Sequence, residues 1–271
     1  SKWISRLAHC LRIWIGAACS KKRWSSLQRN SDAPRGRRAL TGEIIDARDL
    51  IDIAERELMT SLDERAARQA AEAARRAAAF RATHGVPATA KVLLFVGRIN
   101  PKKRLEDIIA AFAELAPREP DLHLILAGQA DAAYSRVLRA MVDRTGLSAR
   151  VRWVGFLDET AKPAAYAAAD CFVHASVSEG MALAILEAMA QGLPVVATEG
   201  CYMRAAAERG ALRECAQGGA ALAAALAPVL ADPAGARALG AAGRRHIREE
   251  HDWDRLARRY LRIYEEGLRA R

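Results

Sequence analysis

The 271 residues are 51% hydrophobic, enough to bury a sizeable core, and no apolar run reaches the ~18 residues of a membrane-spanning helix. The net charge of +10 does not predict a nucleic-acid partner, because residues 1–40 hold ten Lys and Arg against one acid and leave +1 for the rest. Five scattered cysteines without a C-x-x-C pair predict reduced thiols in a cytoplasmic protein and exclude a disulfide scaffold or a zinc site.

Residues 1–46 form a basic arm that is predicted to be amphipathic or disordered. The stretch "WISRLAHCLRIWIGAAC" gathers Trp3, Leu7, Leu11 and Trp14 near one helical face. One interpretation is peripheral contact of residues 1–40 with an anionic membrane, at its inner face. The alternatives are packing on the core and translation of a segment that is not native to the protein.

Residues 47–84 predict one long helix, and residues 85–271 predict a separate domain. Between residues 49 and 82 the sequence is dense in Ala, Arg and Glu and contains no Gly or Pro, a composition that favours helix. Gly85 and Pro87 then end the helical pattern.

From Lys91 on, short apolar runs alternate with helical patterns. Five buried strands are predicted at residues 91–97, 122–128, 150–155, 170–176 and 193–198, separated by helices at residues 104–116, 133–146, 162–169 and 182–192. After Thr198 the strands are predicted to stop, and helices follow at residues 219–231, 234–250 and 253–270. This alternation predicts an α/β fold with a doubly wound parallel sheet.

The residues that follow the first and fourth strands suit an anion, because ligands of open parallel sheets bind at the carboxyl ends of strands. Arg98 and Lys103 flank a Pro-containing turn that leads into a helix, although a solvent-exposed basic turn is the alternative. After the fourth strand, Gly180 would let the backbone approach a ligand closely. The helix start near Ala182 and Leu183 would point free N–H groups at a phosphate.

Glu179 and Glu187 stand on either side of this helix start. Glu187 lies four residues after Leu183, roughly 6 Å along the helix axis. That is about the separation of a ribose from its diphosphate, so Glu187 can accept hydrogen bonds from two ribose hydroxyls while Glu179 lies where a sugar would be. The alternative is a salt-bridged loop glutamate and a partly exposed helical one.

Five blocks of sequence occur in an order and spacing that resemble the C-terminal, donor-binding domain of the retaining family-4 glycosyltransferases. They are "LLFVGRINPKKRLEDIIAAFAEL", "DLHLILAG", "RVRWVGFL", "AADCFVHASVSEGMALAILEAMAQGLPVVAT" and "WDRLARRYLRIY", and the resemblance covers about residues 75–271. It implies one Rossmann-like half of a GT-B architecture, with an extra N-terminal helix and C-terminal helices. It also implies a nucleoside-diphosphate sugar as donor and a glycan or lipid as acceptor. A non-catalytic module that binds nucleotide sugar is the alternative.

The resemblance implies a role for each matching residue. Glu179 is predicted to be catalytic and to touch the donor sugar. The predicted donor-binding residues are Gly97, Arg98 and Lys103 after the first strand, Gly155, Phe156 and Leu157 at the base, Gly180, Met181, Ala182 and Leu183 at the helix start, and Glu187 at the ribose. The family generally needs no bound metal or cofactor, since cations and a helix dipole stabilise the leaving diphosphate.

The sequence departs from the family pattern at several points. Ala182 replaces a usual Gly, which is expected to add strain or shift specificity, and Arg204 and Ala205 replace a usual Pro-Glu. The strand that normally follows is degenerate in "ALRECAQ". His174 is interpreted as a polar strand-end residue rather than a catalytic one.

No acceptor domain is recognisable in residues 1–90, so a separate acceptor domain is expected as a partner and transfer by this chain alone is expected to be poor. The apolar face of the last helix then needs a covering partner, for which residues 49–82 are one candidate. That face consists of Trp253, Leu256, Tyr260, Ile263 and Tyr264.

Overall fold

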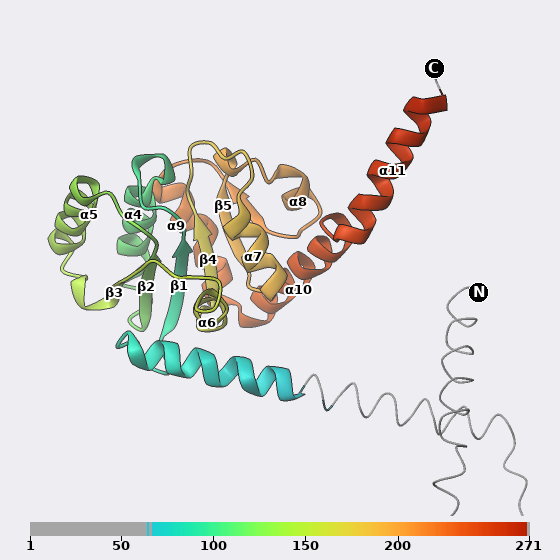
Figure 1. The fold of residues 1–271 in the computed structure, drawn as a ribbon. Helices are drawn as coiled ribbons and strands as arrows, with labels where there is room; N and C mark the ends of the chain where they lie inside the picture. Colours follow the sequence, from blue (N-terminus) through green and yellow to red (C-terminus); the bar gives the residue numbers. More distant parts are fainter. Residues whose placement is uncertain (1–63, 65–66, 270–271) are drawn as a thin grey trace, which may run out of the picture. The chain divides into compact units, whose positions relative to one another are not determined.

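A six-stranded parallel sheet lies at the centre of the fold (Figure 1). The computed structural model describes residue 64 and residues 67–269. The predicted basic arm, residues 1–46, and the first part of the predicted long helix, residues 47–63, lie outside the described residues.

The strands lie in the order β3-β2-β1-β4-β5-β6, and each neighbouring pair is parallel. Their bounds are β1 Lys91–Val96, β2 Leu122–Ala127, β3 Val151–Gly155, β4 Cys171–His174, β5 Val195–Thr198 and β6 Arg213–Cys215. The doubly wound parallel sheet predicted from the sequence is therefore confirmed. The chain winds outward in one direction from β1 and in the other from β4, so the strand order reverses between these two strands.

The prediction that strands stop after Thr198 is wrong. Residues Arg213–Cys215 form β6, which pairs with β5 through the register Ala197↔Glu214. This edge strand has only three residues, and two of them are charged. It therefore lacks the continuous apolar run by which the four inner strands are recognisable.

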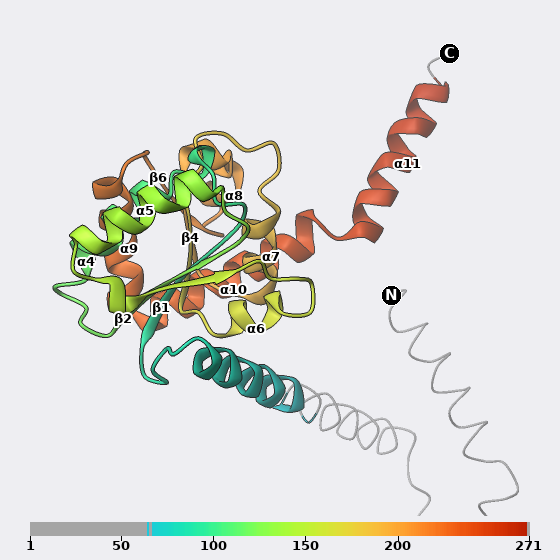
Figure 2. The ribbon, with the colours of Figure 1, turned by 60° about the vertical axis from the view of Figure 1, so that its left-hand side comes forward.

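Helices cover both faces of the sheet (Figure 2). One face carries α4 Leu105–Leu115, α5 Ala132–Arg144 and α9 Gly219–Ala231, and the other carries α6 Lys162–Ala167, α7 Leu183–Gln191 and the end of the helix at 67–83. Strand β1 shows why both faces of the sheet must be covered by helices. Leu93 and Phe95 pack into the first cluster, and Val92 and Leu94 pack into the second, since successive side chains of a strand point to opposite faces.

Residues 67–83 are helical, as predicted, and the C-terminal end of this helix joins the core. Phe80 is 7% exposed and lies in the same cluster as Val92 and Leu94. The guanidinium of Arg81 donates to the backbone oxygens of Ala90 and Ala168, at 2.8 and 3.0 Å. These contacts attach the helix to the amino ends of the strands, which is the edge opposite the carboxyl ends.

The remaining helices follow β5 and β6 in the sequence. They are α8 Arg204–Glu208, α10 Pro233–Glu250 and α11 Trp253–Arg269. Helix α10 packs on α7 and α9. Within the described residues no single helix has both the length and the apolar composition to cross a membrane; only α9 and the helical stretch after it pass jointly, and they meet at a bend of 106°.

Much of the predicted apolar face of α11 has no cover among the described residues. The side chains of Tyr260, Ile263 and Tyr264 are between 53% and 66% exposed. Residues 67–82 therefore do not cover this face as the sequence had suggested, and residues 49–63 of the same candidate lie outside the described part of the chain.

Candidate functional site

A pocket of about 510 Å³ lies at the carboxyl ends of β1 to β4, where the strand order reverses. Open parallel sheets bind their ligands at this position, because the loops on the two sides of the reversal diverge and leave a crevice. The pocket is lined by Val96, Gly97, Arg98, Lys103, Ala127, Gly128, Gln129, Phe156, Leu157, Lys162, His174, Glu179, Met181, Ala182, Leu183, Ala184 and Glu187.

Most of the residues predicted from the sequence meet in this pocket. Ten of them line it: Gly97, Arg98, Lys103, Phe156, Leu157, Glu179, Met181, Ala182, Leu183 and Glu187. Gly155 and Gly180 are chain neighbours of lining residues but do not line it themselves. Sequence reasoning missed Lys162, Gln129 and Gly128, and it gave His174 no part in a site.

The end of β1 brings two cations to the pocket. Arg98 is exposed, and within the described residues its side chain makes no ion pair. Lys103 ends the 3-10 turn Pro101–Lys103, and its side chain is only 15% exposed. A Cβ at Gly128 would lie 1.7 Å from the carbonyl oxygen of Gly97, so glycine lets the ends of β1 and β2 approach closely here.

Glu179 is held by two donors from different parts of the chain. Its Oε1 accepts hydrogen bonds from Lys103 Nζ and, at 3.2 Å, from His174 Nε2. The bond from His174, and then the bond from Lys103, lower the pKa of Glu179 against the opposing effect of burial. Glu179 is therefore an ionised carboxylate with a side chain that is only 10% exposed.

His174 is a neutral, buried imidazole beside this carboxylate. It is 2% exposed and stacks on Phe95 and Phe172, with ring centroids 5.2 and 6.0 Å away. Burial lowers the pKa of His174, so the ring is uncharged. Because a carboxylate only accepts, Nε2 carries the proton, and Nδ1 has no hydrogen-bond partner among the described residues.

Backbone contacts fix the loop that carries Glu179. Val177 N donates to Lys102 O at 3.0 Å, and Glu179 N donates to Gly200 O at 3.0 Å. A Cβ at Gly200 would lie 2.3 Å from the carbonyl oxygen of Ser176, so only glycine fits at this crossing. The loop after β4 is thus fastened both to the turn after β1 and to the turn after β5.

Helix α7 begins at the pocket without a side-chain cap. Ala182 has φ −82° and ψ 71°, and Leu183 N donates to Met181 O at 3.0 Å, the pattern of an inverse γ-turn. The backbone does not require glycine at this position, because any L-residue adopts this φ. The first residues of α7 line the pocket, so the positive end of the helix dipole lies where it would favour an anion.

Glu187 lies one turn inside α7 and accepts from two side chains of α6. Lys162 Nζ lies 2.9 Å from its Oε1, and the hydroxyl of Tyr166 lies 2.7 Å from its Oε2. The Glu187 side chain is 36% exposed and borders the pocket. Both glutamates are therefore ion-paired, as the alternative interpretation held, and both also line the pocket.

The end of β3 forms the rim of the pocket. Gly155 has φ +73°, a left-handed conformation that favours glycine and turns the chain toward Phe156. The ring of Phe156 is 76% exposed and offers an apolar face at the mouth of the pocket, beside Leu157.

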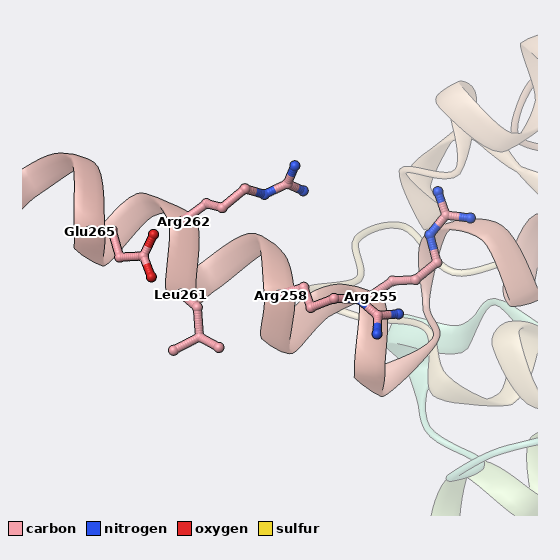
Figure 3. Close-up of a pocket in the computed structure, with 5 residues that line it drawn as sticks. All are labelled: Arg255, Arg258, Leu261, Arg262 and Glu265. Atoms are coloured by element: carbon pink, nitrogen blue, oxygen red, sulfur yellow. The ribbon is translucent and has the colours of Figure 1, made fainter. Parts of the chain in front are cut away.

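Other candidate sites in the described residues are weaker. No three His, Cys, Asp or Glu side chains come together in this part of the chain as metal ligands would. A second hollow, of about 670 Å³, follows α11 and is lined by Arg255, Arg258, Leu261, Arg262 and Glu265 (Figure 3). All of these residues come from one helix, so the hollow has a single wall and does not converge polar groups on a ligand.

Comparison with known proteins agrees with the fold. The family model described as "Glycosyl transferases group 1" matches residues 77–246, more than half of the chain. The chain is 30% identical over 185 residues to the phosphatidyl-myo-inositol mannosyltransferase of Mycobacterium leprae, which covers 67% of this chain and 48% of that relative.

Two solved structures show the same fold. Sucrose-phosphate synthase from Thermosynechococcus elongatus is 31% identical with a TM-score of 0.62, and the match covers 70% of this chain and 49% of that one. Anabaena HepE in complex with UDP-glucose is 25% identical with a TM-score of 0.63, over 70% of this chain and 52% of that one. The chain thus spans about half the length of these relatives. On these findings, the chain belongs to the group 1 glycosyl transferases, and the resemblance inferred from its sequence is confirmed.

Proposed function

We propose that this domain binds a nucleoside-diphosphate sugar in the pocket where the strand order reverses. The sugar nucleotide would be the donor for retaining transfer to a glycan or lipid acceptor. The observation that carries the proposal is the convergence of Arg98, Lys103 and the uncapped start of α7 on one space. Glu187 lies one helical turn beyond that anion site. A solved relative, Anabaena HepE, was crystallised with UDP-glucose, which supports a uridine nucleotide as the first donor to test.

The chemistry proposed for the pocket is electrostatic. When the bond between sugar and diphosphate breaks, negative charge develops on the leaving phosphate, and preorganised cations and N–H groups lower the energy of that state. Arg98 is available for this role without breaking an ion pair of the described residues, and Lys103 would share its charge between the phosphate and Glu179. These groups supply the positive charge that a metal would otherwise provide, so we propose that no metal or other cofactor is needed.

Glu179 is proposed as the carboxylate that faces the donor sugar. Hydrogen bonds from His174 and Lys103 keep it ionised, so it can stabilise positive charge that develops on the sugar ring but has no proton to give. Phe156 and Leu157 line the pocket after β3, and the base is proposed to lie against them.

The acceptor is proposed to come from a second domain. Retaining transfer requires an acceptor hydroxyl on the same face of the sugar as the leaving group, and the described residues supply one sheet. The chain spans about half the length of these relatives, and we propose that the acceptor site lies outside the described residues, in a separate domain. The contact of residues 1–40 with a membrane and a cytoplasmic location stay predictions, since that segment lies outside the described residues.

Titration of nucleotides against Arg98→Ala tests the donor proposal. UDP, GDP and ADP are each compared with their nucleosides by calorimetry, so that the diphosphate contribution is separated from that of the base. A charge-assisted hydrogen bond to phosphate is worth about 1.5–3 kcal/mol, so the variant should bind the diphosphate at least ~10-fold more weakly and the nucleoside unchanged. Arg118→Ala, an exposed arginine between α4 and β2 at the opposite edge of the sheet, is the matched control.

Two results would contradict the proposal. One is an equal loss of nucleoside and diphosphate affinity in Arg98→Ala, which would place Arg98 away from the phosphates. The other is absence of binding by all three diphosphates to the wild type. Incubation with UDP-glucose and mixed acceptors then separates an enzyme from a non-catalytic binding module: multiple turnovers by the isolated chain would show that it needs no separate acceptor domain.

A further inference from the structure

Two side chains of α6 hold the carboxylate of Glu187. Lys162 Nζ is 2.9 Å from Oε1 and the Tyr166 hydroxyl is 2.7 Å from Oε2, so each carboxylate oxygen has its own donor. Lys162 and Tyr166 are four residues apart, so both project from the same face of α6. The two donors therefore act on Glu187 as a pair.

This arrangement leaves Glu187 with a specific set of free acceptor positions. An ionised carboxylate has about four lone-pair sites, two on each oxygen. One bond to each oxygen leaves one free site on each, and both free sites lie in the carboxylate plane, whose rotation the two donors fix. A vicinal diol, which presents two hydroxyl donors side by side, matches this remaining pair.

The burial of the two donors differs. The Tyr166 ring is 3% exposed and packs on Phe172 at a centroid distance of 5.9 Å, so its hydroxyl has a fixed position. Burial, and then the bond to Glu187, raise the pKa of Tyr166, so the hydroxyl keeps its proton and donates. Lys162 is 16% exposed and divides its charge between Glu187 and the exposed Glu159, which lies 2.6 Å away.

We infer that Tyr166 and Lys162 are positioning residues that fix Glu187 as a two-point acceptor for the vicinal hydroxyls of a ribose. This inference rests on the proposed nucleotide site and adds to it a specificity for ribonucleotides over 2′-deoxyribonucleotides. Without the donors, the Glu187 side chain, which is 36% exposed, would have several rotamers and no fixed carboxylate plane. Tyr166 does not line the pocket, and Lys162, which does, bonds to the carboxylate, so both are proposed to act through Glu187.

The test compares UDP with 2′-deoxy-UDP, and GDP with 2′-deoxy-GDP, in the wild type and in Tyr166→Phe. The wild type should prefer the ribonucleotide by tenfold or more, and Tyr166→Phe should reduce this preference at least threefold. The affinity for the 2′-deoxy nucleotide should stay unchanged, because that ligand cannot use both acceptor sites. If the tyrosine had only a structural role, its loss would weaken the binding of both nucleotides equally.

Tyr134→Phe is a matched control for loss of a buried tyrosine hydroxyl. The Tyr134 hydroxyl donates to Glu106 at 2.6 Å, and this pair joins α5 and α4 outside the pocket. The control should lose stability as Tyr166→Phe does and keep the full preference for ribose. Lys162→Met is the second test variant, and it should also lower the preference for ribose. It serves as the test if Tyr166→Phe does not fold.

The outcomes separate this inference from the function on which it rests. If nucleotide binding depends on Arg98 but the wild type does not distinguish ribose from deoxyribose, the inference fails while the donor site stands. An unchanged preference in both Tyr166→Phe and Lys162→Met also overturns it. If no ribonucleotide binds at all, the proposed function fails and the inference fails with it.

Discussion

The two glutamates of the pocket are the same residue type in two different settings. Glu179 lies in a loop, is 10% exposed, and takes its donors from β4 and from the turn after β1. Glu187 lies in α7, is 36% exposed, and takes both donors from the preceding helix α6. The position of Glu179 thus depends on contacts between the loops after β1 and β4, whereas that of Glu187 depends on the packing of α6 against α7. Loss of a charged partner should therefore affect Glu179 more, and loss of an orienting hydrogen bond should affect Glu187 more.

The largest difference between the two settings should appear when each lysine is removed. Lys103→Ala leaves the buried Glu179 carboxylate without its cation, and breaking a buried pair from one side costs about 3 kcal/mol of unfolding free energy. Lys162→Ala leaves the more exposed Glu187 with water and Tyr166, and the loss should be less than ~1 kcal/mol. Urea unfolding of both variants gives the comparison.

A double variant checks that the loss in Lys103→Ala comes from the unpaired charge. Replacing both partners, as in Lys103→Met with Glu179→Gln, removes the charges together and should recover most of the lost stability. Equal destabilisation by Lys103→Ala and Lys162→Ala would show that the two glutamates are not held differently.

The next expected effect is a loss of folding stability at low pH, caused by Glu179. The pKa of Glu179 in the folded state lies below its ordinary value of 4.5, because His174 and Lys103 bond to the ionised form. The unfolded state therefore binds the proton first as the pH falls, and the stabilisation present above about pH 4.5 is lost as the pH falls toward the folded pKa. Between about pH 5 and pH 3, wild-type stability should fall by up to ~1.4 kcal/mol per pH unit more than that of Glu179→Gln.

His174 adds a second acid-sensitive group near Glu179. Burial lowers its pKa below the ordinary value of 6.5, so the unfolded state takes up a proton below that pH while the folded state does not. The sign is the same as for Glu179, and stability is lost as the pH falls. Parallel pH profiles for wild type and Glu179→Gln would argue against an ionised, hydrogen-bonded Glu179.

The smallest effect is expected at the start of α7, between the two glutamates. Ala182 is 6% exposed with φ −82°, so glycine is not required there. Ala182→Gly should lower the unfolding free energy by about 0.5–1 kcal/mol through the greater freedom of the unfolded chain. Nucleotide affinity should change little, and a gain in stability would mean that the Cβ is strained after all.

Much of the fold and of the site followed from local patterns. The inner strands are buried on both faces, so they appear as continuous apolar runs, and the residues after them fall at the carboxyl edge wherever the sheet is parallel. That reasoning placed Arg98, Lys103, Glu179 and Glu187 in one pocket. It failed for β6, whose three residues pair with β5 without a run of their own.

The sequence by itself determined the elements, the parallel sheet and the edge at which the pocket opens, because these depend on periodicity and on the order of strands along the chain. Only the tertiary structure decided which donors hold each carboxylate. Lys103 reaches Glu179 across 76 positions, and Lys162 reaches Glu187 across 25. No periodicity relates residues so far apart, since their meeting depends on how the turn after β1 and helix α6 pack against neighbours from elsewhere in the chain. The roles of His174 and Tyr166 as hydrogen-bond donors were found only in the structure for the same reason. Their pKa values depend on burial, which the packed core creates.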